Sequence, residues 1–314
     1  MDTVSEIIPI ELDKYFKTIS RCPLCGGENH TRLFKINKLI FFECKSCRFR
    51  FMNPYLSDQG MKILYENSEI LSQINPALEK YYEYRTDRKI NRTIMDYQMV
   101  LEFLGKNLPL SADKPKLFEI GYGNGSFLLE AIRYGWEADG IETSKQNNES
   151  LKTNYGIYSQ CGTFDDFKPP RSQYQMVAFW DVIEHTMHPR SYVKKAWEML
   201  EPGGLLVLAT PNIAGLLNQL AEGFYFLSMG KIKSAIKQLY IFEHVGYYTP
   251  KTLTQLVLME GFELKKIFLT ETDLERYKFS PLLRFCLRIF FFIARLLHLQ
   301  NRMILIAQKK THGS

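Results

Sequence analysis

The sequence has no long uninterrupted hydrophobic run. Its most apolar stretch, residues 282–299, contains Arg284, Arg288, Arg295 and His298. Three arginines in a stretch of that length argue against a membrane-spanning helix. Residues 1–16 also lack the basic start and the apolar core of a secretory signal. We therefore expect a cytoplasmic protein, and peripheral attachment to a membrane surface stays open.

Cysteine is scarce, and the charge is close to balance. Of the six cysteines, four fall in two Cys-x-x-Cys pairs, while Cys161 and Cys286 stand alone. This pattern suits reduced thiolates that hold a metal better than a disulfide framework. Lysine and arginine number 40 against 34 acidic residues, a net charge of +6, without the dense clustering of a dedicated nucleic-acid-binding protein. Nucleic acid is not favoured as a partner, although RNA is not excluded, and the oligomeric state is left open.

Strand and helix patterns alternate through the larger part of the chain. Strands are expected at residues 116–120, 137–141, 157–160, 174–180, 205–209, 262–269 and 303–308. Helices are expected at 126–134, 145–154, 189–200 and 250–260. Continuous apolar strands separated by short helices are typical of a parallel sheet that is covered on both faces. The predicted fold class is α/β, a doubly wound, mostly parallel sheet preceded by a small cysteine-containing module.

Three segments are expected along the chain. Residues 1–56 form the small module, with short strands at 31–34 and 39–43. Residues 57–106 form a helical connector or cap, with helices at 58–66 and 76–104. Residues 107–314 form the large domain, with apolar insertions at 215–240 and 280–300.

The small module carries a metal-binding pattern. Cys22 and Cys25 are followed, after eighteen intervening residues, by Cys44 and Cys47. Two Cys-x-x-Cys hairpins supply the four thiolates of a tetrahedral zinc site. Since four cysteines leave no open position on the metal, the zinc is expected to be structural. Zinc ribbons also bind RNA, and the aromatic residues around Phe41 and Phe51 could stack on bases or pack the ribbon onto its neighbour.

A glycine-rich turn follows the first strand of the large domain. Gly121, Gly123 and Gly125 come directly after Glu119-Ile120, and glycine lets a backbone turn sharply and approach a ligand closely. Glu142 ends the second expected strand, where a carboxylate can accept hydrogen bonds from both hydroxyls of a ribose. Ligands of such sheets bind beyond the carboxyl ends of the strands. The pattern indicates a nucleotide site, and a simple tight turn is the alternative.

These motifs resemble those of class I S-adenosylmethionine-dependent methyltransferases. The segment from Glu119 to Gly125 looks like their motif I, and Asp181-Val-Ile-Glu-His185 followed by Glu201-Pro-Gly-Gly204 resembles the ubiquinone-biosynthesis O-methyltransferase group. The resemblance implies a Rossmann-like fold, with S-adenosylmethionine along the glycine turn. It implies further that Glu142 holds the ribose, that Thr163 and Phe164 lie near the adenine, and that Asp181 lies beside the methionine end.

Four titratable residues are candidates for the catalytic group. Asp181, Glu184 and His185 would share one face if a helix or turn begins at Asp181, and His244 is the fourth. Together they could bind a divalent cation that activates a substrate hydroxyl, a pattern that resembles the metal site of small-RNA 2′-O-methyltransferases except that Asp181 stands where those have Glu. Otherwise His185 or His244 is a general base, or both histidines only orient the substrate.

The two insertions suggest where an acceptor binds. The segment 215–240 should cover the acceptor pocket, which favours a bulky or amphiphilic substrate, and Tyr81, Tyr82 and Arg85 are candidates for its other side. The basic residues of 280–300 fall on one narrow stripe of a helix. Such a helix could lie in a membrane interface beside anionic lipid, or it could be buried or form a dimer contact.

The sequence therefore predicts a methyltransferase and leaves its substrate open. O-methylation of a hydroxylated small or lipid-linked metabolite comes first, with a sugar or glycan precursor ahead of a quinol. An RNA methyltransferase that uses the ribbon for recognition is a second reading. A scaffold that binds the cofactor without turnover belongs to a third class.

Overall fold

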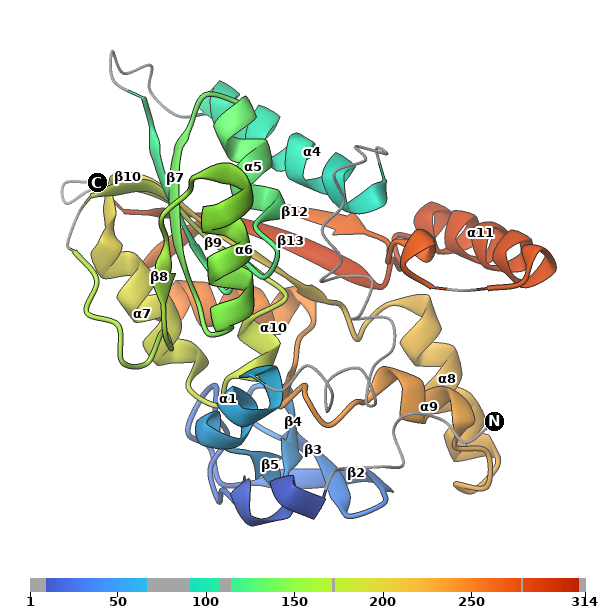
Figure 1. Cartoon of the computed structure of the whole chain (residues 1–314). Helices are drawn as coiled ribbons and strands as arrows, with labels where there is room; N and C mark the ends of the chain where they lie inside the picture. The colour runs from blue at the N-terminus through green and yellow to red at the C-terminus, as the bar shows by residue number, and fades with distance from the viewer. Residues whose placement is uncertain (1–9, 67–90, 108–113, 171–172, 278, 311–314) are drawn as a thin grey trace.

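The computed structural model of the chain describes residues 10–66, 91–107, 114–170, 173–277 and 279–310. Its centre is a seven-stranded sheet with the order β12-β13-β10-β9-β6-β7-β8 (Figure 1). The strands are β6 (Lys116–Ile120), β7 (Glu137–Glu142), β8 (Gln160–Cys161), β9 (Tyr174–Trp180), β10 (Leu200–Pro211), β12 (Phe262–Thr270) and β13 (Arg302–Lys309). β13 runs antiparallel to β10 and β12, and the other neighbouring strands of this sheet are parallel to each other. The predicted doubly wound, mostly parallel sheet is confirmed.

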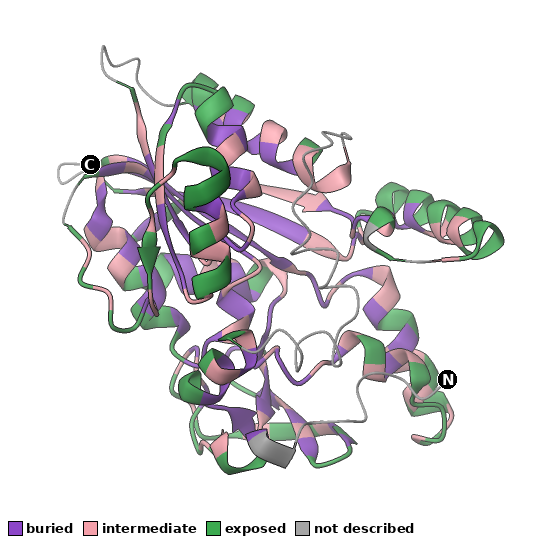
Figure 2. Cartoon of the chain, viewed as in Figure 1, coloured by how far each residue is buried: buried purple, intermediate pink, exposed green. Residues whose placement is uncertain are grey.

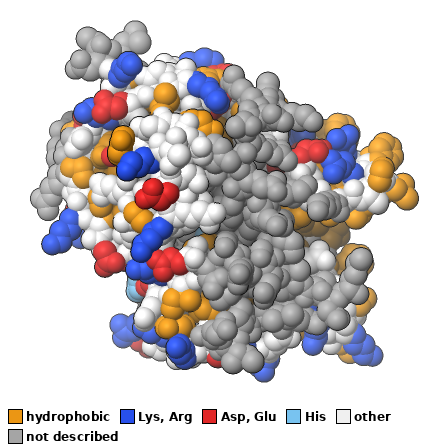
Figure 3. Space-filling model, in the orientation of Figure 1, with side chains coloured by type: hydrophobic (Ala, Val, Ile, Leu, Met, Phe, Trp, Pro, Cys, Tyr) orange, Lys and Arg blue, Asp and Glu red, His pale blue; other side chains and the backbone are white. Residues whose placement is uncertain are grey.

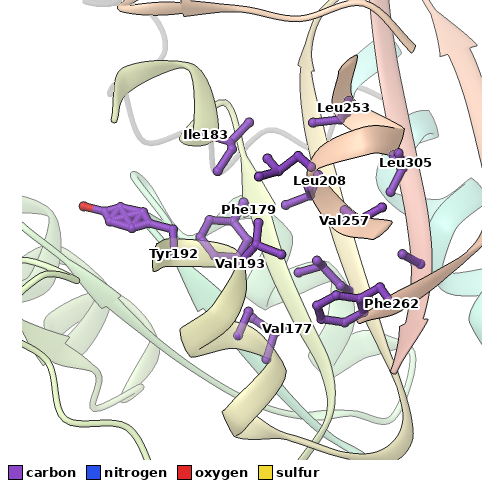
Figure 4. Packing of buried hydrophobic residues seen from close by; sticks show 14 of the residues in the cluster. Val177, Phe179, Ile183, Tyr192, Val193, Leu208, Leu253, Val257, Phe262 and Leu305 are labelled. Atoms are coloured by element: carbon purple, nitrogen blue, oxygen red, sulfur yellow. The ribbon is translucent and has the colours of Figure 1, made fainter. Parts of the chain in front are cut away.

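Helices cover both faces of this sheet because its side chains alternate between two hydrophobic cores. One core takes Leu117 and Met176 against α4 (Arg92–Asn107), α5 (Ser126–Arg133) and α6 (Lys145–Tyr155). The other takes Phe118 and Val177 against α7 (Pro189–Met199) and α10 (Pro250–Met259). Figure 4 shows Val193 of α7 and Val257 of α10 packed against Phe179 and Leu208 of the sheet. This two-sided burial accounts for the near-continuous apolar character of the strands.

A second sheet joins the cysteine module to the large domain. Its order is β11-β4-β3-β2, with β2 (His30–Ile36), β3 (Leu39–Cys44), β4 (Arg50–Asn53) and β11 (Gly246–Tyr247). The short β11 comes from the large domain and pairs Gly246 with Phe51 of the module. Next to this sheet lie η2 (Ile10–Tyr15), β1 (Phe16–Lys17), β5 (Tyr55–Leu56) and α1 (Asp58–Glu66). The module expected over residues 1–56 thus completes its sheet with a strand from far along the chain.

The two apolar insertions are helical and lie beyond the carboxyl edge of the main sheet. The first contains α8 (Leu216–Leu227) and α9 (Ser234–Leu239), and the second contains η4 (Leu274–Arg276) and α11 (Pro281–Leu296). Figure 2 shows α11 with mostly exposed residues, in contrast to the buried strands. None of the helices in the described ranges has the length and apolarity needed to cross a bilayer.

Most of the expected elements begin and end within a few residues of their predicted bounds, with two exceptions. The strand expected at 205–209 extends over 200–211, with a register shift between Leu200 and Leu205, because Glu201-Pro-Gly-Gly204 continues the strand through an irregularity. The weak strand expected at 157–160 is reduced to the two residues of β8. The first part of the helix expected at 76–104 lies outside the described residues, as do Tyr81, Tyr82 and Arg85.

Candidate active site

The glycine turn between β6 and α5 has the backbone that only glycine adopts readily. Gly121 and Gly125 have φ angles of 65° and 74°, in the left-handed region that L side chains rarely adopt. A Cβ on Gly125 would also lie 2.5 Å from Leu151 Cδ1, and one on Gly121 would lie 2.7 Å from Val182 Cγ2. Both conformation and space therefore require glycine at these two positions. The turn ends at the N-terminus of α5, whose dipole favours an anionic or polar ligand.

Glu142, at the end of β7, reaches the glycine turn directly. Its Oε2 accepts a hydrogen bond from Gly123 N at 2.9 Å, and its Oε1 accepts one from Ser144 N at 2.8 Å. Burial raises the pKa of Glu142, while these backbone N–H groups act in the opposite direction. A carboxylate offers about four acceptor sites, so two remain for the hydroxyls of a ribose. The turn and the carboxylate are thus close enough to contact one ligand.

Glu119, at the end of β6, is the second carboxyl group on this side. It is buried, and its Oε2 has no hydrogen-bond partner. Burial first, and the charge of Glu142 second, hold the pKa of Glu119 well above its ordinary value. The raised pKa favours the neutral form, which can donate a hydrogen bond as well as accept one.

Thr163 and Phe164, expected near the adenine, occupy different environments. The Thr163 hydroxyl donates to Asp166 Oδ2 at 2.7 Å. The ring of Phe164 is buried in the core, 5.1 Å from the ring of Tyr192 and 5.8 Å from that of Phe179. The side chain of Phe164 thus packs in the core on the α7 face, and its expected place near the adenine stays a prediction.

Asp181 follows β9 with a φ of 56°, so it lies outside the short helix η3 (Ile183–His185) that comes after it. The expected common helical face of Asp181, Glu184 and His185 is therefore wrong, since a positive φ interrupts the helix. Instead the Asp181 carboxylate accepts a hydrogen bond from Arg302 Nη2 at 2.5 Å. Burial opposes the charge of Arg302, but the attraction of Asp181 outweighs it and raises the pKa of the guanidinium.

This ion pair lines a polar pocket at the carboxyl edge of the sheet. The lining residues come from four elements or their ends, α4, β9, β12 and β13: Thr93, Asp96, Tyr97, Trp180, Asp181, Glu271, Asp273 and Arg302. The pocket adjoins the glycine turn, because Ile120 pairs with Phe179 in neighbouring strands, and the next residues are Gly121 of the turn and Trp180 of the pocket. The free volume of the pocket is about 10 Å³, which is room for one water molecule.

Glu184, His185 and His244 form a separate cluster. A ligand atom from each lies within 4.8 Å of the others, and the two imidazole rings are 4.8 Å apart. His185 Nδ1 lies 2.9 Å from the carbonyl oxygen of Glu243 and 3.1 Å from the Tyr65 hydroxyl. Since a carbonyl only accepts, Nδ1 carries the proton, and Nε2 presents its lone pair. Three of the four predicted catalytic residues therefore meet. Asp181 is not one of this set, but its charge acts on the pKa of all three.

Burial controls the charges of this cluster. It lowers the pKa of His185, and together with the neighbouring His185 it lowers the pKa of His244 well below its ordinary value. Burial, and then the charge of Asp181, raise the pKa of Glu184 to about 8. Both oxygens of Glu184 lack a hydrogen-bond partner. Two neutral imidazoles beside an unpartnered buried carboxyl group are a set that can accept a proton or ligate a divalent cation.

The four cysteines of the module lie together, and Cys44 is the last residue of β3. Their Sγ atoms are all within 4.8 Å of one another, and the Cys22–Cys47 and Cys25–Cys44 pairs are each 3.6 Å apart. Tetrahedral zinc with Zn–S bonds of about 2.3 Å separates its sulfurs by about 3.8 Å. The cluster is compatible with a zinc ribbon. Cys22, Cys44 and Cys47 also belong to the core that contains Phe179 and Leu208, so the site is joined to the large domain.

One arginine of the module reaches the first insertion. Arg50 donates from Nε to Glu43 Oε2 at 2.9 Å and from Nη1 to Glu222 Oε1 of α8 at 2.8 Å. The same Nη1 lies 3.1 Å from the hydroxyl of Tyr240, which follows α9. Arg50 therefore couples the cysteine module to the insertion that was expected to cover the acceptor pocket.

Sequence reasoning missed four charged residues of the polar pocket. Asp96 lies inside α4, Glu271 and Asp273 follow β12, and Arg302 is the first residue of β13. Glu271 and Asp273 did carry a signal, since acidic residues directly after a parallel strand lie at the ligand-binding edge of the sheet. Nothing in the sequence distinguished Arg302 from other basic residues.

Comparison with known sequences agrees with this geometry. Residues 87–267, more than half of the chain, match a family described as a methyltransferase domain. The chain belongs to this methyltransferase-domain family, and the resemblance to S-adenosylmethionine-dependent methyltransferases is confirmed. The protein is therefore an enzyme of the methyltransferase class, and its fold is Rossmann-like.

Curated relatives include two ubiquinone biosynthesis O-methyltransferases. The one from Bradyrhizobium diazoefficiens is 26% identical over 147 residues, which cover 45% of this chain and 53% of the relative. The one from Parvibaculum lavamentivorans is 27% identical over 141 residues, covering 41% and 55%. The chain thus spans about half the length of these relatives. Among solved structures, the [4+2]-cyclase SpnF matches with a TM-score of 0.53 at 12% identity, covering 82% of this chain and 97% of SpnF; this likeness concerns the fold alone.

Proposed function

We propose that the protein transfers a methyl group from S-adenosylmethionine to a hydroxyl group of a small or lipid-linked metabolite. A sugar or glycan precursor is the first candidate for the acceptor, and a quinol is the second. The single observation that carries the proposal is the adjacency of two sites at one sheet edge. The glycine turn with Glu142 lies beside the polar pocket of Asp181 and Arg302.

The residues around the glycine turn fit S-adenosylmethionine. Gly121, Gly123 and Gly125 allow the close backbone approach, and Glu142 has two acceptor sites to spare for the ribose. The cofactor supplies a methyl group on a sulfonium, a good leaving group. The protein's contribution is to hold the acceptor oxygen in line with that methyl group, and such positioning supplies a large part of the rate.

The pocket chemistry supports a polyhydroxylated acceptor over a quinol. Four carboxyl groups, one guanidinium and one threonine line the pocket, together with Tyr97 and Trp180, whose rings lie 4.6 Å apart edge to face. Charged acceptors and donors bind hydroxyl groups with strong, directed hydrogen bonds, while aromatic rings contact the apolar faces of a sugar. A quinol ring would need fewer polar groups and more apolar surface.

A hydroxyl acceptor must lose its proton, and the Glu184–His185–His244 cluster offers two routes. In the first, the neutral imidazole of His244 or His185 accepts the proton. In the second, Glu184, His185 and His244 hold a divalent cation that lowers the pKa of the acceptor hydroxyl. The proton on His185 Nδ1, held by the Glu243 carbonyl, orients Nε2 for either role.

The four thiolates of Cys22, Cys25, Cys44 and Cys47 would hold a structural Zn²⁺. With four protein ligands the metal has no open position for water, so its contribution is to fold the ribbon on which Arg50 and the α8 insertion depend. The aromatic rings of the ribbon weigh against RNA recognition, because Phe41, Phe49 and Phe51 are buried and cannot stack on bases. An RNA methyltransferase and a scaffold without turnover remain the rival readings.

Transfer of a labelled methyl group from S-adenosylmethionine tests the proposal. Nucleotide-linked sugars, lipid-linked sugars, a quinol and RNA are offered as acceptors, and the sugars are expected to be labelled. Glu142→Gln should weaken cofactor affinity roughly tenfold or more in calorimetry, while Glu137→Gln, at the exposed start of the same strand, should not. His244→Ala should lower turnover by about 100-fold or more with unchanged cofactor affinity.

The outcomes separate the readings. Labelling of RNA alone would establish the RNA reading, and cofactor binding without labelling of any acceptor would favour the scaffold. Activity that falls when magnesium is removed, with the zinc content unchanged, would identify the metal route. An unchanged rate in His244→Ala would remove this histidine from both routes.

A further inference from the structure

The helix α11 presents its apolar side outward. Of its sixteen residues only Phe291 and Ala294 are buried, and Leu282, Phe285, Phe292 and Leu296 are 73, 62, 56 and 65% exposed. An amphipathic helix on a globular protein ordinarily turns its apolar side to the core. Here the large side chains face water, and an exposed apolar patch of this kind marks an interaction site.

The basic stripe of the same helix faces acidic residues of the protein. Arg284 and Arg288 pair with Glu275 next to the helix, with N–O distances of 2.5 and 3.6 Å. Arg295 pairs with both oxygens of Glu271 at 2.9 and 2.8 Å. These ion pairs fix the rotation of α11, so the outward direction of its apolar residues is built into the fold.

The first insertion carries a matching surface. On α8 and the following turn, Phe224, Phe226, Leu227 and Met229 are 56, 51, 85 and 83% exposed. The turn continues through Ile232, which is 52% exposed and lies between the exposed Lys231 and Lys233. Large apolar side chains flanked by lysines are the composition of a segment that enters a lipid headgroup region.

The two insertions are anchored at one point. Leu216 N, at the start of α8, donates to the carbonyl of Leu299, just after α11, at 2.8 Å, and Asn212 N donates to the carbonyl of Asn301 at 2.9 Å. In Figure 1 both helices project on the same side of the main sheet, and Figure 3 shows hydrophobic and basic side chains gathered at the end of the molecule where α11 lies. We call the exposed apolar residues of α8, its following turn and α11 the docking surface.

The charge of the docking surface points to an anionic partner. The arginines of α11 are paired with Glu271 and Glu275, so the basic charge beside the docking surface comes from the first insertion. No acidic residue occurs there between Glu222 and Glu243, a segment that contains three lysines. A helix of sixteen residues is about 24 Å long, shorter than the hydrocarbon core of about 30 Å. The segment therefore suits a position in the plane of the interface and not a span across it.

We propose that the docking surface binds the face of an anionic lipid bilayer. Both insertions are anchored beside the polar pocket. Asn301, which accepts the hydrogen bond from Asn212, is followed directly by Arg302, and Arg302 lines the pocket. A bilayer against the docking surface would present a lipid-linked acceptor at that pocket; this part of the inference rests on the proposed function. Binding to the bilayer itself does not depend on it.

Vesicle co-sedimentation of the full zinc-loaded chain tests the proposal. Vesicles of phosphatidylcholine mixed with phosphatidylglycerol should bind the protein roughly tenfold more than vesicles of phosphatidylcholine alone. The double variants Phe285→Ser/Phe292→Ser and Leu227→Ser/Met229→Ser should each reduce binding roughly tenfold. Lys231→Gln/Lys233→Gln should reduce binding to the anionic vesicles only. The control Leu258→Ser removes an apolar side chain of α10 that is 52% exposed and should bind like the natural sequence.

Circular dichroism and the melting temperature establish that each variant is folded, independently of cofactor binding. The proposal is overturned if the natural protein stays in the supernatant with anionic vesicles, or if the folded double variants bind them as well as it does. It is also overturned if light scattering shows a dimer that the double variants convert to monomers, because a second copy then covers the surface. Loss of methyl transfer with vesicle binding intact would contradict the proposed function and leave this inference standing.

Discussion

The proposed cofactor side and the proposed acceptor side of the sheet edge are assembled in different ways. On the cofactor side, Glu119, the glycine turn and Glu142 lie on one strand–turn–helix–strand unit, β6 to β7. On the acceptor side, the pocket combines α4, β9, β12 and β13, so that Asp96 meets Arg302. The ribbon contributes to this side as well: Phe51 pairs with β11, and Arg50 donates to Glu222 of the first insertion.

The two sides differ in how far apart in the sequence their contacting residues lie. The cofactor side depends on a local turn and one parallel strand pair, so changes there should have local effects. The acceptor side depends on contacts that close long loops of chain, and their entropic cost must be offset by packing and ion pairs elsewhere. We therefore expect the acceptor side to be sensitive to distant substitutions and the cofactor side to be largely independent of them.

The largest expected effect comes from the ribbon. Cys22→Ser should remove zinc and destabilise the protein by roughly 5 kcal/mol or more, because metal binding supplies folding free energy to a module of this size. Metal analysis and denaturant unfolding measure the change. Cys161→Ser, at an exposed cysteine outside the cluster, should neither remove zinc nor destabilise the protein. A Cys22→Ser protein that is folded and free of metal would show that zinc is not structural here.

A smaller effect is expected at the ion pair of the polar pocket. Arg302→Gln should destabilise the protein by about 3 kcal/mol, since it leaves the Asp181 carboxylate without its partner, and should raise the KM for the acceptor with cofactor affinity unchanged. Asp181→Asn/Arg302→Gln should recover stability but not the acceptor KM. If cofactor affinity falls as much as acceptor affinity, the two sides of the edge are not independent.

The smallest effect is expected on the cofactor side, at Glu119. Its pKa is raised in the folded protein, so the folded state keeps this proton to a higher pH than the unfolded chain does, and its contribution to stability declines as the pH rises above about 4.5. Glu119→Gln stays neutral at every pH. Without cofactor, its melting temperature should exceed that of the natural protein by about 3 °C at pH 8, with the difference closing toward pH 5. The control Glu149→Gln, at an exposed position, should show no change of this difference with pH. If Glu119→Gln shows none either, the pKa of Glu119 is not raised and the prediction is wrong.

Much of the main sheet could be read from the sequence, because each strand is buried on both faces and is therefore a continuous apolar run. The glycine turn and Glu142 were equally readable, since their geometry is fixed within one local unit. The resemblance implied that Phe164 lies near the adenine, and only the structure shows that its ring packs against Tyr192 in the core. Asp181 was expected on a helical face, and only its positive φ turns it toward Arg302 instead.

The order of residues by itself determined the strands of the doubly wound sheet, the glycine turn and the four cysteines that are spaced for one metal. These features follow from side-chain periodicity and backbone conformation over a few residues. The tertiary structure alone decided that Asp96, Asp181 and Arg302 share a pocket, that β11 completes the sheet of the ribbon, and that α11 turns its apolar side outward. Each of these depends on which distant groups neutralise a charge or complete a hydrogen-bond ladder, and no local pattern encodes that choice.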